Sequence, residues 1–129
     1  MANLIDTMNY DGLISGLAPE PVVAAGLIRK LGTAATYKRG TILAKSSGSA
    51  GDDKLVILGT TAATNETLTA YAILADDTAI GTAADVNAAI YKAGCFDPDK
   101  LAVKSGYTIT EGDKDDLRNG GVFLSPVIN

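Results

Sequence analysis

The sequence predicts a single domain of mainly β structure with one or two short helices. Glycine is frequent, with 14 residues among 129, and it repeatedly closes short apolar segments, which is typical of brief strands joined by turns. The apolar fraction is 47%, but tryptophan is absent and aromatic residues make up only 5%, so the core must consist mostly of small aliphatic side chains. A length of 129 residues suits one ordinary domain, and no internal repeat marks a second.

The first twenty residues differ from the rest of the chain. Two glycines and a proline interrupt them, and their apolar residues come in pairs at 4–5 and 13–14 without sustained periodicity. Such a terminal stretch often becomes ordered only when something holds it. We therefore predict an arm at residues 1–20 and a β-rich domain at residues 21–129.

Short extended segments follow the arm. Residues 22–28 are a weak strand candidate, and residues 41–45 are a stronger one. A stretch rich in serine, glycine and aspartate at 46–53 predicts a loop, and residues 54–58 form the clearest strand of the chain. We expect the two stronger strands to form a hairpin with a long connection, followed by a surface loop at 60–66.

The second half of the chain predicts further strands and one helix. Residues 67–74 carry apolar groups on both faces, which indicates a strand buried on at least one side. Residues 82–85 have the form of a helix start, but residues 88–92 also fit a strand, so the residues alone leave this choice open. Residues 110–120 predict a helix of about two turns, ending at Asn119-Gly120, and the triplet Val122-Phe123-Leu124 predicts a last strand.

Charge and hydropathy argue against several functional classes. The net charge is −4 and no basic cluster exceeds a pair, so the chain offers no face for direct nucleic-acid binding. Its longest apolar run is too short to cross a bilayer, which argues against a membrane protein. No secretory signal opens the chain, so we expect synthesis in the cytoplasm.

Candidate catalytic and metal-binding groups are few. The chain has no histidine, which is the commonest general base and metal ligand, and its one cysteine, Cys95, has only Lys92 nearby in the sequence to activate it. We expect Cys95 to be a half-buried structural thiol. The acidic residues at 97–99 and 111–116 lack the spacing of a calcium loop, so we interpret them as turn and helix-cap residues. We therefore expect no enzymatic activity, no cofactor and no metal site.

Three stretches carry a family resemblance. They are YDGLISG at residues 10–16, YKRGTILAK at 37–45, and a block that runs from YAILADD at 71–77 to IYKAGCF at 90–96. In this order, and with the acidic helix and final strand behind them, they resemble the phage head decoration protein family. The resemblance extends over nearly the whole chain and favours a strand, not a helix, at residues 90–92.

The resemblance implies both a fold and a function. The fold would be a β-clip-like bent ribbon or a small incomplete barrel. The function would be that of a homotrimer on the exterior of the virion, which binds the major capsid protein of an expanded tailed-phage head and stabilises the shell against the pressure of packaged DNA. The protein would be made in the host cytoplasm. We expect the arm to attach it to the shell, through the apolar residues Leu4, Ile5, Tyr10, Leu13 and Ile14.

One other class remains open. A stand-alone β-rich module that binds a small molecule or a carbohydrate would be a monomer with a pocket lined by aromatic side chains. Five tyrosines and two phenylalanines, spread along the chain, make such a pocket difficult to assemble.

Overall fold

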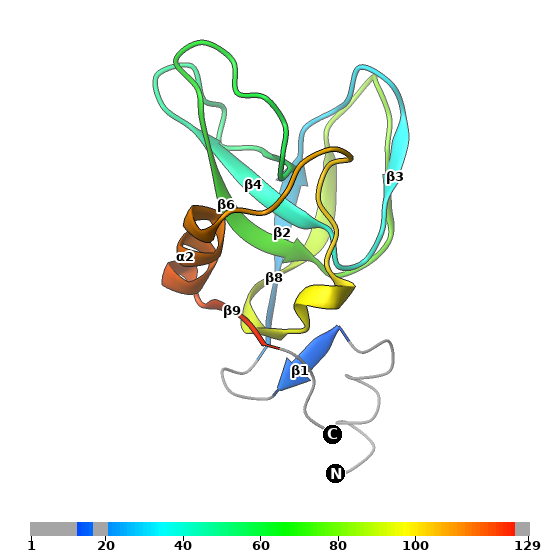
Figure 1. Cartoon of the computed structure of the whole chain (residues 1–129). Coiled ribbons are helices and arrows are strands. Elements are labelled where there is room, and N and C mark those ends of the chain that lie inside the picture. The colour runs from blue at the N-terminus through cyan, green and yellow to red at the C-terminus, as the bar shows by residue number, and fades with distance from the viewer. Residues whose placement is uncertain (1–12, 17–20, 126–129) are drawn as a thin grey trace.

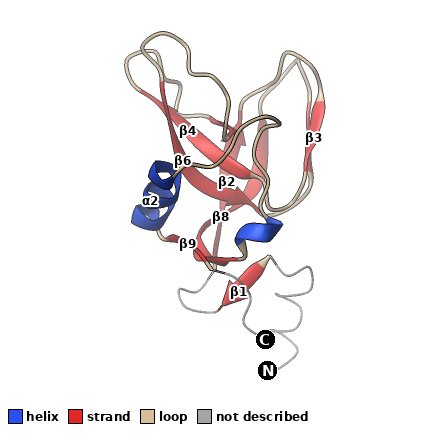
Figure 2. Ribbon diagram, viewed as in Figure 1, coloured by secondary structure: helices blue, strands red, loops and turns tan. Residues whose placement is uncertain are grey.

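The computed structural model describes residues 13–16 and 21–125 (Figures 1 and 2). Within them, nine strands are joined to one α-helix and one short 3₁₀ helix. In chain order the elements are β1 (Ile14–Gly16), β2 (Val22–Ile28), β3 (Ala35–Tyr37), β4 (Ile42–Ser47), β5 (Leu55–Ile57), β6 (Thr67–Leu74), β7 (Thr78–Ile80), β8 (Val86–Phe96), η1 (Pro98–Lys100), α2 (Glu111–Gly120) and β9 (Val122–Leu124). The prediction of a mainly β single domain is confirmed.

Five strands close into a small barrel. The hydrogen-bonded order is β8-β2-β5-β4-β6, and β6 pairs back with β8. The closure is therefore more complete than the expected incomplete barrel. Two of the strand pairings that close the barrel are short: β6 pairs with β8 at two residue pairs, and β2 pairs with β5 only at Ile28 and Leu55.

The predicted strands are confirmed in place and in pairing. The two stronger candidates form the antiparallel hairpin β4–β5, with the predicted loop between them. The ambiguous segment at 82–92 contains no helix. Its residues 82–84 form a bend, and the strand β8 begins at Val86 and runs antiparallel to the whole of β2. Pairing with β2 buries Ala88 and Ile90, and this tertiary gain outweighs the helix preference of alanine.

Three short strands were not predicted. β3 and β7 pair with each other as a separate two-stranded sheet beside the barrel, on the right in Figure 1. β1 pairs with β8, where Ile14 lies opposite Phe96. Residues 13–16, which the sequence assigned to the arm, are thus part of the folded domain.

The core has two parts. One cluster lies around the inward side chains of the barrel, including Leu43, Leu55 and Ile90. The other lies where β1, β9 and α2 pack on the barrel, and it includes Phe96 and Leu117. Most members are alanine, valine, leucine or isoleucine, as the composition predicted.

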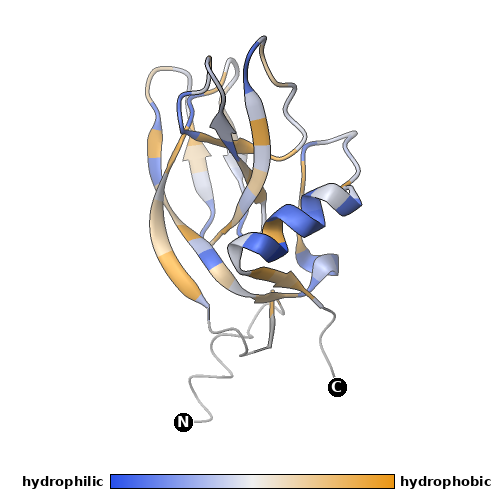
Figure 3. Cartoon of the chain, turned by 90° about the vertical axis from the view of Figure 1, so that its left-hand side faces the viewer, coloured by the Kyte–Doolittle hydropathy of each residue, from blue (hydrophilic) through white to orange (hydrophobic). Residues whose placement is uncertain are grey.

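Helix α2 follows the predicted signals. Thr110 caps its first turn in a capping box with Asp113, and Gly121 ends it in the left-handed conformation with φ of 106°. Leu117 is its one buried residue, and it fastens the helix to the second core cluster. Figure 3 shows a mostly hydrophilic helix with one short hydrophobic stretch.

Candidate functional site

The residues predicted to bind the capsid fall into two groups. Leu4, Ile5 and Tyr10 lie outside the described residues. Leu13 and Ile14 are described, and both are buried in the chain's own core, with exposed fractions of 1% and 2%. The Leu13 carbonyl also accepts a hydrogen bond of 2.8 Å from the Asp97 amide. In this conformation these two side chains anchor the N-terminal segment to β8, and a capsid contact by them stays a prediction.

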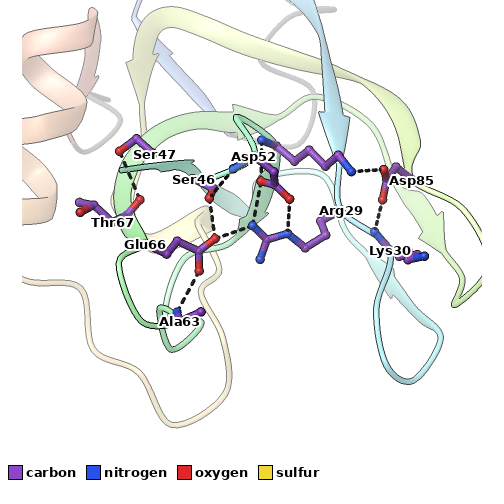
Figure 4. Close-up of polar contacts among 10 residues, drawn as sticks. Arg29, Lys30, Ser46, Ser47, Asp52, Ala63, Glu66, Thr67 and Asp85 are labelled. Carbon is purple, nitrogen blue, oxygen red and sulfur yellow. Dashed lines mark hydrogen bonds and ion pairs between the residues drawn. The ribbon is translucent and has the colours of Figure 1, made fainter. Parts of the chain in front are cut away.

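A polar network occupies the end of the barrel from which the two long loops extend (Figure 4). The Arg29 guanidinium donates to both carboxylate oxygens of Asp52, at 3.0 and 2.8 Å, and to Glu66 at 2.5 Å. Glu66 also accepts from the Ser46 hydroxyl at 2.5 Å and from the Ala63 amide at 3.0 Å. The Glu66 side chain is only 4% exposed, so these contacts replace nearly all of its hydration.

The network shifts the pKa values of its members. Hydrogen bonds from the Ala63 amide, Ser46 and Arg29 lower the pKa of Glu66 to about 2. The hydrogen bonds from Arg29 lower the pKa of Asp52 to about 2 as well, and the two carboxylates raise the pKa of Arg29. Each ionised form is thus stabilised by the others, and the network ties the loops at 48–53 and 60–66 to the end of β2. We interpret this network as a structural feature that holds the loops in place, and not as a reactive centre.

Further polar contacts lie beside this network. The Lys54 ammonium lies 2.7 Å from Asp85, and the Lys30 amide donates to the same carboxylate at 2.8 Å. Hydrogen bonds from Lys54, which has the larger effect, and from the Lys30 amide lower the pKa of Asp85. The start of β8 is therefore joined to β5 and to the segment after β2.

The outer surface of β2 is apolar. Val22, Val23 and Leu27 are the large aliphatic side chains that the described residues leave most exposed, at 50%, 60% and 37%. The strand contains no charged residue and only small or aliphatic side chains. An apolar strip of this kind on a small protein is typical of a contact surface.

A hollow lies beside this strip. It is bounded by residues 24–27 of β2 and by Lys45 of β4, Tyr71 of β6 and Lys92 of β8, and we call it the β2 groove. Both ammonium groups stack over the Tyr71 ring, with Lys45 Nζ 5.1 Å and Lys92 Nζ 5.3 Å from its centroid. The groove therefore combines an apolar wall with two positive charges.

The remaining candidate groups have structural roles. Cys95 is half-buried in β8, as predicted. Asp97 caps η1, Asp113 completes the cap of α2 and also accepts from the Tyr107 hydroxyl, and Asp115 pairs with Arg118. Among residues 13–16 and 21–125, no group of three or more acidic or cysteine side chains is placed to hold a metal ion. No helix in this part of the chain is long and apolar enough to cross a membrane.

Comparison with known proteins decides the family. The family model described as bacteriophage lambda head decoration protein D matches residues 10–120. The chain belongs to this family. The match includes the three stretches that suggested it, and it extends from the segment before β1 to the end of α2. No curated protein sequence shows a significant match to the chain.

Sequence reasoning did not find the β2 groove. Lys45, Tyr71 and Lys92 belong to three strands that are distant in the sequence, and only barrel closure brings them together. One signal was present in the sequence. Residues 22–28 have no polar face, although a strand that is half-exposed to water normally alternates.

Proposed function

We propose that this head decoration protein is a non-enzymatic cementing protein. It binds the major capsid protein on the exterior of an expanded tailed-phage head as a homotrimer, and it stabilises the shell against internal DNA pressure. The observation that carries the proposal is the family match over residues 10–120. A closed barrel whose carboxylates serve as caps and ion-pair partners is consistent with a mechanical role.

The mechanism follows from multivalency. Three weak contacts made by one trimer hold as a single strong one, because the second and third contacts form at a high effective concentration. A closed three-fold assembly also limits the protein to one cap per site and prevents open fibres. The trimer would thus join several shell subunits without any single tight interface.

We assign attachment to the N-terminal arm. An extended segment can add a strand to an exposed sheet edge of the capsid protein, and alternate side chains can then enter shallow pockets. Leu4, Ile5 and Tyr10 are the side chains proposed for this contact. Leu13 and Ile14 fix the end of the arm to the barrel, since both are buried against β8 and its neighbours.

The deciding experiment uses expanded, undecorated heads of the phage that encodes the chain. The protein is mixed with heads, unbound protein is removed by sedimentation, and bound protein is located by cryo-electron microscopy. We expect trimers on the outer surface and heads that resist higher internal pressure or temperature. A chain that lacks residues 2–12 should keep its melting temperature and lose binding, and undiminished binding by this deletion would refute the role of the arm.

A further inference from the structure

We propose that the open edge of β2 accepts an extended, acidic peptide segment of the capsid shell protein, which lies in the β2 groove as an added strand. The source of the segment rests on the proposed function. The arm would carry a strand from this protein to the shell, and the β2 groove would receive one in return.

The edge of β2 that lies opposite β8 is largely unpaired among the described residues. β2 pairs with β8 along its whole length, but on its other side it meets β5 only at Ile28. On that side the Arg29 amide donates to the Leu55 carbonyl at 2.9 Å. Because backbone groups of a strand point to alternate sides, those of Ala25 point to the same side as those of Arg29. Within the described residues no strand pairs with β2 there before Ile28, so a strand edge is open to a partner.

The surroundings of this edge suit an added strand in shape and polarity. Gly26 faces the barrel interior, where an added Cβ would lie 2.6 Å from Leu55 Cδ1. Val23, Ala25 and Leu27 face outward and are exposed. A strand laid against this edge would therefore gain main-chain hydrogen bonds and, with its alternate side chains, apolar contacts on the outer face.

Two lysines lie in the groove. Neither Lys45 nor Lys92 has an ion pair among the described residues, and their ammonium groups instead share the Tyr71 ring. Asp53 also borders the groove, which leaves its lining with a net positive charge on a chain whose total is −4. A carboxylate on the incoming strand would meet two ammonium groups, whereas a basic strand would be repelled.

The same charges argue against pairing between two copies of β2. A second β2 strand is apolar and carries no carboxylate for the lysines. A three-fold assembly also cannot pair identical edges with each other, because such isologous contacts need a two-fold axis. An acidic segment from a different chain can pair with the open backbone groups of β2 and also place a carboxylate near the lysines.

The test measures binding to expanded, undecorated heads with two kinds of groove variant. Ala25→Pro removes an amide on the open side of β2 and leaves the groups that face β8. The pair Lys45→Glu and Lys92→Glu reverses the charge of the groove without changing the backbone. The matched control is the pair Lys100→Glu and Lys104→Glu, which makes the same charge change on exposed lysines outside the groove. Circular dichroism melts establish that each variant is folded.

We expect both groove variants to bind heads about tenfold more weakly or worse, and the control pair to bind like the parent chain. In images of decorated heads, density for an added strand should lie beside β2. If the parent chain binds heads and the folded groove variants bind equally well, this proposal is wrong and the proposed function stands. If the parent chain does not bind heads, both this proposal and the proposed function are wrong.

Two further results are decisive. If Ala25→Pro does not fold, the charge-reversed pair decides alone, since it leaves the edge intact. If Ala25→Pro or the charge-reversed pair lowers self-association in light scattering without heads, the edge pairs copies of this chain, and the assignment to a shell segment is overturned.

Discussion

The substitution Leu13→Ala distinguishes an anchor from a free arm. If residue 13 belonged to a free arm, its truncation would weaken head binding without changing the stability of the domain. The structure predicts the opposite, because the Leu13 side chain is 1% exposed and packs in the second core cluster. Leu4→Ala is the matched comparison, since it makes the same chemical change in the part assigned to the arm.

The size of the effect follows from burial. The change removes three carbon atoms from the core, worth about 2.4 kcal/mol of transfer free energy, and the cavity left behind brings the usual range for buried leucine to about 2–5 kcal/mol. For a domain of this size, a loss of about 3 kcal/mol lowers the melting temperature by about 10–15 °C. Such a loss is a large part of the total stability of an ordinary domain.

The assay is urea unfolding followed by far-ultraviolet circular dichroism, together with binding to heads at a temperature where each variant is folded. Leu13→Ala should move the unfolding midpoint strongly and leave the slope unchanged. Leu4→Ala should leave the midpoint in place and weaken binding. A loss below about 1 kcal/mol for Leu13→Ala would refute the assignment of Leu13 to the core.

Three further predictions concern the domain itself. Leu117→Ala should cost about 2–5 kcal/mol in urea unfolding because Leu117 is the one buried residue of α2, whereas Asp116→Ala on the exposed face should stay within about 0.5 kcal/mol. The pKa of Glu66 is about 2 in the folded protein, which is below its ordinary value. The stability that Glu66 contributes is therefore complete above about pH 5 and is lost as the pH falls toward 2. The urea midpoint of Glu66→Gln should depend less on pH across this window than the midpoint of the parent chain. Gly59→Ala should lower the melting temperature, because φ at Gly59 is 109° and an added Cβ would lie 2.7 Å from Tyr107 Cβ. The control is Gly81→Ala, whose added Cβ meets no atom within 4 Å, and it should leave the melting temperature unchanged or raise it.

Local patterns predicted most of the strands. Residues 67–74 and 54–58 were found because apolar and β-branched residues mark a strand without reference to its partners. The final helix was predicted from local signals at its ends, and Thr110 and Asp113 make the reciprocal hydrogen bonds of a capping box at its start. These elements owe their form to neighbours within a few residues.

Elements that depend on distant partners were missed or left open. The alanine-rich segment in β8 is a strand because β2 lies beside it, and alanine itself would favour a helix. The pair Leu13-Ile14 was assigned to the arm because its partner, Phe96, lies far along the chain. The three residues of β3 and of β7 are too few to show a period, and each strand depends on the other.

The arrangement of the lysines bears on why β2 keeps an open edge. Natural sheets often place a lysine on an edge strand to prevent pairing with other chains. Here β2 itself has no charged residue from Val22 to Ile28, and the lysines come from neighbouring strands and stack on Tyr71. This position repels a basic strand and leaves an apolar strand without a partner for the ammonium groups, but it attracts a strand that carries a carboxylate. The same two charges that protect the edge from indiscriminate pairing therefore select an acidic partner.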